Sequence, residues 1–108
     1  MNNNRLEKLQ EMEKGAPLDS FLKYAIAIEY LSQNEIEKAT LNFEWLLQNT
    51  PHYLATYYQW GKLCEVTGHF LKAKIIYEDG LRLATAMGEN KTAQELQEAI
   101  NNIEPDVF

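Results

Sequence analysis

The sequence contains one cysteine, three prolines and no apolar run near the ~18 residues that a membrane-spanning helix needs. A single cysteine excludes an internal disulfide bond and agrees with a reducing compartment. The first residues, Met-Asn-Asn-Asn-Arg-Leu-Glu-Lys, lack the apolar core of a secretion signal. We therefore expect a cytoplasmic protein that does not associate with membranes.

Basic residues are also scarce, since ten Lys and Arg stand against sixteen Asp and Glu, which gives a net charge of −6. Nucleic-acid binding needs a basic stripe, so we expect no nucleic-acid partner. The two histidines, His52 and His69, have no second ligand at a metal-binding spacing, and no glycine run is present to bind phosphate. We expect no catalytic residue, no cofactor and no metal.

What the sequence does contain is a repeat, in which residues of the same kind recur at one fixed offset. Pro17 and Pro51 stand 34 apart. At the same offset Ile26, Ala27 and Tyr30 correspond to Trp60, Gly61 and Cys64, while Ala39 and Phe43 correspond to Ala73 and Tyr77. A fixed period of this length is typical of stacked helix-turn-helix units.

These residues resemble the tetratricopeptide repeat (TPR) pattern, which is W-x2-L-G-x2-Y, then A-x3-F, then P. Three positions depart from it: Lys23 replaces an aromatic residue, Cys64 replaces Tyr, and Thr85 replaces the closing Pro. The resemblance implies an all-α, right-handed α-α superhelix of two TPR units, with an N-terminal half-repeat helix before them and a C-terminal capping helix after them.

We expect one domain over residues 1–108. Its parts are a half-repeat helix at residues 3–16, repeats at 18–51 and 52–87, a capping helix at 90–103 and a tail at 104–108. Six helices are predicted, over about residues 3–14, 19–32, 36–49, 53–67, 69–86 and 90–102. Asp19 and Asn90 are the expected N-caps, and Asn34 and Gly68 are expected to adopt the left-handed conformation at helix ends.

In this family the first helix of each repeat lines a concave groove, so the resemblance places a protein-binding site there. The lining residues would be Phe21, Tyr24, Ile28 and Leu31 in the first repeat, and Tyr58, Lys62, Glu65 and Val66 in the second. Aromatic residues are enriched at binding hot spots. The alternative is that a terminal helix covers these side chains as an extension of the core, and both interpretations stay open.

A resemblance to the TPR domains that bind chaperone C-termini is not supported. Those domains use Lys and Asn side chains, whereas this chain has Tyr24, Ile28 and Gln59 at the corresponding places. We expect instead a non-catalytic module that binds a peptide segment or helix of a protein partner.

A second surface gives the alternative function. Leu41 and Trp45 are four residues apart on a face that is usually polar in the family, and Ile75 corresponds to Leu41 one repeat later. A contiguous apolar surface often marks an interface. The alternative is therefore a homo-oligomeric structural protein, such as a homodimer, assembled through a convex apolar patch around Leu41 and an exposed Trp45.

Overall fold

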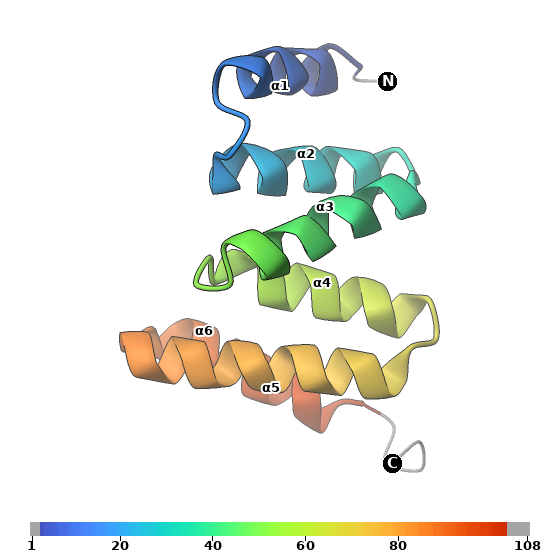
Figure 1. The fold of residues 1–108 in the computed structure, drawn as a ribbon. Coiled ribbons are helices and arrows are strands. Elements are labelled where there is room, and N and C mark those ends of the chain that lie inside the picture. The colour runs from blue at the N-terminus through green and yellow to red at the C-terminus, as the bar shows by residue number, and fades with distance from the viewer. Residues whose placement is uncertain (1–2, 104–108) are drawn as a thin grey trace. The chain divides into compact units, whose positions relative to one another are not determined.

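The structure is a computed structural model that describes residues 3–103. Over this range the chain forms helices and no strand. The six helices are α1 (Asn3–Gly15), α2 (Ser20–Ser32), α3 (Ile36–Asn49), α4 (Ala55–Val66), α5 (Phe70–Met87) and α6 (Asn90–Asn101) (Figure 1). Their ends lie within two residues of the expected ones. The expected tail at 104–108 lies outside the described residues.

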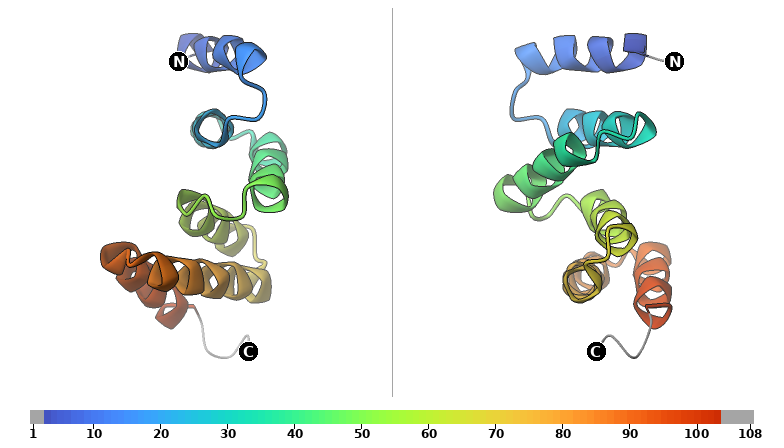
Figure 2. Two further views of the ribbon diagram at one scale, coloured as in Figure 1. Left: turned by 60° about the vertical axis from the view of Figure 1, so that its left-hand side comes forward. Right: turned by 90° about the vertical axis from the view of Figure 1, so that its right-hand side faces the viewer.

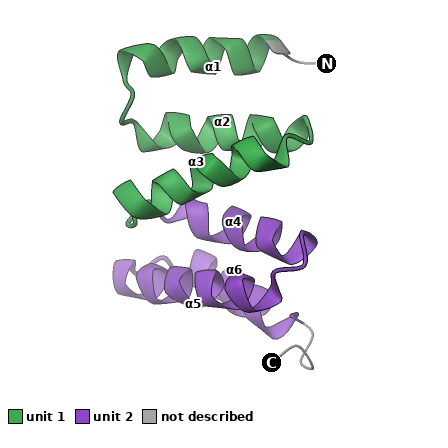
Figure 3. Ribbon diagram, turned by 45° about the vertical axis from the view of Figure 1, so that its right-hand side comes forward, with its two compact units in different colours: residues 1–53 green, residues 54–108 purple. Residues whose placement is uncertain are grey.

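The chain divides into two compact units, unit 1 (residues 1–53) and unit 2 (residues 54–108) (Figure 3). Unit 1 contains α1 to α3, and unit 2 contains α4 to α6. Within each unit, helices that follow one another in the sequence pack together. The all-α fold is therefore as expected, while the single domain over 1–108 stays a prediction.

Left-handed residues end three of the helices in the same way. Asn34, Gly68 and Gly88 have positive φ angles of 62°, 85° and 73°. The amide after each one donates back to a carbonyl five residues earlier, over distances of 2.7 to 2.9 Å: Glu35 to Tyr30, His69 to Cys64, and Glu89 to Ala84. This bonding satisfies helix carbonyls that would otherwise lack a partner. The predicted roles of Asn34 and Gly68 are confirmed.

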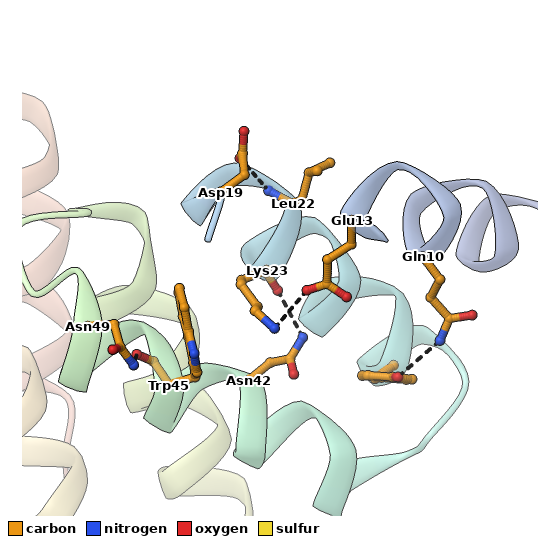
Figure 4. Close-up of polar contacts among 9 residues, drawn as sticks. Gln10, Glu13, Asp19, Leu22, Lys23, Asn42, Trp45 and Asn49 are labelled. Atoms are coloured by element: carbon orange, nitrogen blue, oxygen red, sulfur yellow. Dashed lines mark hydrogen bonds and ion pairs between the residues drawn. The ribbon is translucent and has the colours of Figure 1, made fainter. Parts of the chain in front are cut away.

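Of the two predicted N-caps, the one of α2 is confirmed and the one of α6 is wrong. Asp19 caps α2, because its Oδ1 accepts a hydrogen bond from the Leu22 amide at 3.0 Å (Figure 4). Asn90, in contrast, does not cap α6. Glu89 occupies the N-cap position without a side-chain cap bond, and Asn90 is the first helical residue. The reason is that Gly88 ends α5 so tightly that the next helix begins two residues later.

Unit 1 has an apolar core between α1 and α2. Leu9 of α1 clusters with Leu22, Ala25 and Ile26 of α2, and the partly buried Leu6, Ala16 and Tyr30 pack against them. Ala27 of α2 and Ala39 of α3, which belong to the repeat pattern, are both fully buried, as are Phe43 and Leu46 of α3. The buried residues of α2 and α3 recur at the helical spacing that places them on one face of each helix.

Polar contacts add to this core and explain the unusual Lys23. The Lys23 ammonium forms an ion pair with Glu13 Oε2 of α1 at 2.8 Å and lies 4.9 Å from the centre of the Trp45 ring (Figure 4). On the same pair of helices, Arg5 Nε contacts Glu29 Oε2 at 2.7 Å and Gln10 donates to the Tyr30 hydroxyl at 3.2 Å. Lys23 thus joins α1, α2 and α3 at a place where the family has an aromatic residue.

In unit 2 two glycines allow α5 to pack closely against its neighbours. An ideal Cβ added to Gly61 would lie 2.3 Å from Tyr77 Cε1, and one added to Gly80 would lie 2.5 Å from Tyr57 Cβ. The close approach at Gly61 is therefore that of the Tyr77 ring to the α4 backbone. Leu96 of α6 also reaches Gly80, with its Cδ1 3.2 Å from the same ideal Cβ.

Helix α6 covers α5 with one apolar side. Leu96, Ala99 and Ile103 are buried, and Ala93 and Ile100 are partly buried. Gln94, Glu95, Gln97 and Glu98 are exposed on its other side. Two views in Figure 2 show α6 lying alongside α5. The apolar stripe of the last helix is therefore directed at the protein, as a capping helix requires.

Candidate protein-binding surfaces

The eight residues expected to line a binding groove lie on two helices, one in each unit. Phe21, Tyr24, Ile28 and Leu31 belong to α2, and Tyr58, Lys62, Glu65 and Val66 belong to α4. Because α2 and α4 belong to different units, the two sets form two surfaces.

The surface of unit 1 is apolar and partly exposed. Phe21 is 58% exposed, whereas Tyr24, Ile28 and Leu31 are half-buried. The Tyr24 ring is tilted against that of Tyr53, with 5.8 Å between the ring centres. Burial, followed by the neighbouring Tyr53, raises the pKa of Tyr24 above its usual value, so its hydroxyl stays neutral at physiological pH. This surface therefore offers uncharged aromatic and aliphatic contacts.

In unit 2 the structure brings three of the four predicted residues into one pocket. Tyr58, Lys62 and Glu65 of α4 line a cavity of about 430 Å³, which we call the α4–α6 groove. Its other lining residues are Gln59 of α4, Glu95, Glu98 and Ala99 of α6, and Asn102 directly after α6. A volume of this size fits a side chain or a short peptide segment. Val66, also expected in the groove, is exposed and does not line it.

Charge in the α4–α6 groove is predominantly negative. The carboxylates of Glu65, Glu95 and Glu98 face one ammonium, that of Lys62, which leaves a formal charge of −2. The Lys62 ammonium lies 5.8 Å from the centre of the Tyr58 ring, within the range of a cation–π contact. The groove therefore combines an aromatic face with carboxylates.

One of these carboxylates is held in place by the core. Glu65 Oε1 accepts a hydrogen bond of 2.5 Å from the hydroxyl of Tyr77, a residue that is otherwise fully buried. Burial, followed by this hydrogen bond, raises the pKa of Tyr77 far above its usual value, so the hydroxyl remains a donor. Tyr77 thereby fixes the position of Glu65, while Glu95 and Glu98 are exposed.

The α6 side of this groove was not predicted from the sequence. Helix α6 begins about one repeat period after α4, so it occupies the place of a first helix in a third repeat. Ala99 stands one full period after Glu65, and the two residues line the same groove. The repeat spacing, if extended to α6, would have predicted that α6 lines the groove. The residue motif gives no such signal, because Gln94, Glu95 and Glu98 replace its core residues in α6.

The convex surface differs from the expectation in one respect. Leu41 is 66% exposed, as predicted, and Ile75 in unit 2 is exposed as well. Trp45, however, is half-buried, because the Lys23 ammonium covers its ring. The expected exposed tryptophan is therefore wrong. The reason lies in the replacement of a family aromatic by Lys23, which brings a cation to the indole face.

Other reactive groups show no clustering over residues 3–103. No group of three or more His, Cys, Asp and Glu side chains in this range is arranged to hold a metal ion. Cys64 is buried, and His69 Nδ1 lies 3.0 Å from the Thr67 hydroxyl. Within the same residues every helix is too short or too polar to cross a membrane.

Helix pairs that recur at one fixed period, with the same left-handed ends and the same small residues, define a helical repeat protein. Solved structures identify the kind of repeat. The chain is 36% identical to a tetratricopeptide repeat domain protein from Salinibacter ruber solved by NMR, with a TM-score of 0.77, over 80% of this chain and 87% of that one. The chain belongs to the tetratricopeptide repeat family.

A second structure agrees with this assignment, and a third shares the fold. A crystal structure of a tetratricopeptide repeat domain protein from Salinibacter ruber is 35% identical, with a TM-score of 0.75, and the match covers 79% of this chain and 94% of that one. A protein from Bordetella parapertussis, 21% identical with a TM-score of 0.77, shares the fold over 91% of this chain and 85% of that one. A comparison with family models gave no match, and neither did one with curated protein sequences.

Membership of this family sets the general role of the fold. TPR domains are protein-interaction repeat modules, and their fold is generally a non-catalytic scaffold.

Proposed function

We propose that this protein binds a peptide segment or helix of a partner protein on the first-helix faces of its two repeats. The contact residues are Phe21, Tyr24, Ile28 and Leu31 in unit 1, and Tyr58, Lys62 and Glu65 in unit 2. The observation that supports this best is the α4–α6 groove, in which Tyr58, Lys62 and Glu65 line one cavity. The exposed Phe21 supports it in unit 1, because large apolar side chains left on a surface favour binding.

Selection from a peptide library tests this proposal directly. We expect the immobilised full chain to enrich specific binders from a phage-displayed library of random dodecapeptides. With the selected peptides synthesised, Phe21→Ser and Tyr58→Ala should each weaken binding by about thirtyfold, which corresponds to ~2 kcal/mol for a hot-spot residue. The measurement is the dissociation constant by fluorescence anisotropy, with circular dichroism to verify that each variant is folded.

A matched control separates this surface from the others. Leu71 of α5 is 57% exposed, almost the same as Phe21, and does not belong to either first helix. Leu71→Ser should therefore leave peptide binding unchanged. The proposal is wrong if no peptide is enriched, or if Leu71→Ser or Leu41→Ser removes binding while Phe21→Ser and Tyr58→Ala do not.

The alternative, self-assembly through the convex patch, retains one supporting observation, the exposed Leu41. It loses another, because Trp45 is engaged by Lys23 and contributes less apolar surface than expected. The cytoplasmic location also stays a prediction.

A further inference from the structure

We propose that the partner segment carries an arginine or lysine side chain, and that this side chain binds in the α4–α6 groove. This inference rests on the proposed function and adds the chemistry of the partner to it. The groove has three features that favour a cation: carboxylates without partners, an aromatic face and a fixed acceptor.

The carboxylates of Glu95 and Glu98 lack partners of opposite charge among the described residues. Some acidic side chains elsewhere in the same range are paired, namely Glu13 with Lys23, Glu29 with Arg5, Glu11 with Lys14 and Asp79 with Arg82, whereas Glu95 and Glu98, like Glu37, have no ion pair. Glu95 and Glu98 remain exposed at the mouth of a cavity. A basic group of the partner would form ion pairs with these two carboxylates, whereas an acidic group would be repelled by them.

The aromatic face of the groove already binds a cation. The ammonium of Lys62 lies over the Tyr58 ring, so this ring is accessible to a positive group. The distance of 5.8 Å is near the outer limit of about 6 Å for a cation–π contact, so the internal contact is a loose one. A guanidinium group stacks on aromatic rings and pairs with carboxylates in a bidentate manner, and arginine is therefore the better ligand.

The third feature is the position of Glu65. Its hydrogen bond to the buried Tyr77 hydroxyl fixes one carboxylate oxygen, so a partner would find this acceptor already ordered. Ordering before binding lowers the entropic cost of association. The cavity of about 430 Å³ accommodates one long side chain with its flanking backbone.

The first repeat shows that this chemistry is specific to unit 2. The residues one repeat before Lys62 and Glu65 are Ile28 and Leu31, both apolar. The surface of unit 1 therefore selects apolar groups, and the α4–α6 groove selects a basic one. The expected partner segment is amphipathic, with aliphatic or aromatic residues and at least one basic residue.

The experiment uses the full chain and the peptides that it selects from the random dodecapeptide library. We expect arginine and lysine to be enriched at one position of the selected peptides relative to the unselected library. A selected peptide is then synthesised in four forms, with arginine, lysine, norleucine or glutamate at that position. The arginine form should bind most tightly, the norleucine form about tenfold more weakly, and the glutamate form more weakly still.

Variants of the protein locate the contact. The double variant Glu95→Gln/Glu98→Gln should lower the affinity for the arginine peptide by about tenfold and leave the affinity for the norleucine peptide unchanged. This difference, read as a double-mutant cycle, measures the interaction between the two glutamates and the arginine. Glu37→Gln on α3, an exposed glutamate outside the groove, should change neither affinity. Lys62→Met should tighten binding of the arginine peptide, because it removes a competing cation from the Tyr58 ring.

The possible results distinguish this inference from the proposed function. The inference is overturned if the selected peptides show no excess of basic residues, or if the arginine peptide binds the double variant with normal affinity. In either case Phe21→Ser and Tyr58→Ala still test whether the peptides bind on the first-helix faces. Failure to select any peptide overturns the proposed function and this inference together.

Discussion

At the scale of single residues, Gly61 is the position where the sequence motif has the clearest structural cause. A Cβ at this place would lie 2.3, 2.6 and 2.9 Å from three carbons of the Tyr77 ring. The ring cannot move aside easily, because Tyr77 is fully buried and its hydroxyl is bonded to Glu65. Only a residue without a side chain fits against it.

We therefore predict that Gly61→Ala destabilises the protein by ~1–3 kcal/mol through overpacking. The gain in helix propensity, about 1 kcal/mol at most, acts in the opposite direction and is smaller than the expected clash. Gly15→Ala is the control, since nothing lies within 4 Å of the corresponding Cβ, and it should be neutral or stabilising. Urea denaturation measures both. If the two variants had equal free energies of unfolding, the close contact between Gly61 and the Tyr77 ring would be contradicted.

Lys23 shows where residue-level prediction from sequence ends. The repeat period identifies Lys23 as a departure from the family pattern, but not the reason for it. The reason involves Glu13 on α1 and Trp45 on α3, which precede and follow Lys23 at distant positions in the sequence. Such a contact depends on how three helices pack, and no local spacing rule relates these positions. The exposed Trp45 was mispredicted for the same reason.

At the scale of helices, prediction from the sequence was most successful, because helix ends have local chemical causes. Asp19, Asn34 and Gly68 act within a few residues of themselves, so their roles follow from the side chain alone. The cap of α6 was missed because Gly88 and Glu89 compete with Asn90 for the same turn. Where several adjacent residues could each serve as the N-cap, the sequence predicts the start of the helix only to within one or two positions.

Helix α6 is predicted to be required for the solubility of unit 2. Its Leu96, Ala99 and Ile103 are buried, and its opposite side is polar, so it covers apolar surface that a repeat stack would otherwise expose. Removal of residues 90–108 should cause aggregation, seen by light scattering. It should also reduce helicity by more than the loss of α6 itself accounts for, as measured by circular dichroism. A soluble truncated chain with the thermal midpoint of the intact protein would contradict the capping role.

At the scale of the whole molecule, the net charge of the chain has the same sign as the charge of the α4–α6 groove. The chain has a net charge of −6. A basic partner would be attracted over long distances and then held locally, with rates that fall as salt is added. Tyr58, Lys62 and Glu65, three of the four α4 residues that line this groove, were predicted from the sequence, because they follow the repeat. It did not predict the α6 wall, where the core motif is absent but the repeat spacing persists.

The oligomeric state decides between binding and self-assembly. We expect a monomer whose mass by light scattering does not change with concentration in the micromolar range. Stable interfaces bury at least about 1,200 Å², and the convex surface has lost Trp45 as a free contact through Lys23. If a dimer does form, Leu41→Glu should dissociate it only when the convex patch is the interface. Leu18→Glu, at another exposed leucine outside α3, is the matched control. A dimer lost in Leu41→Glu and kept in Leu18→Glu would replace the proposed function with the structural alternative, since the self-associating surface would then be the one around Leu41.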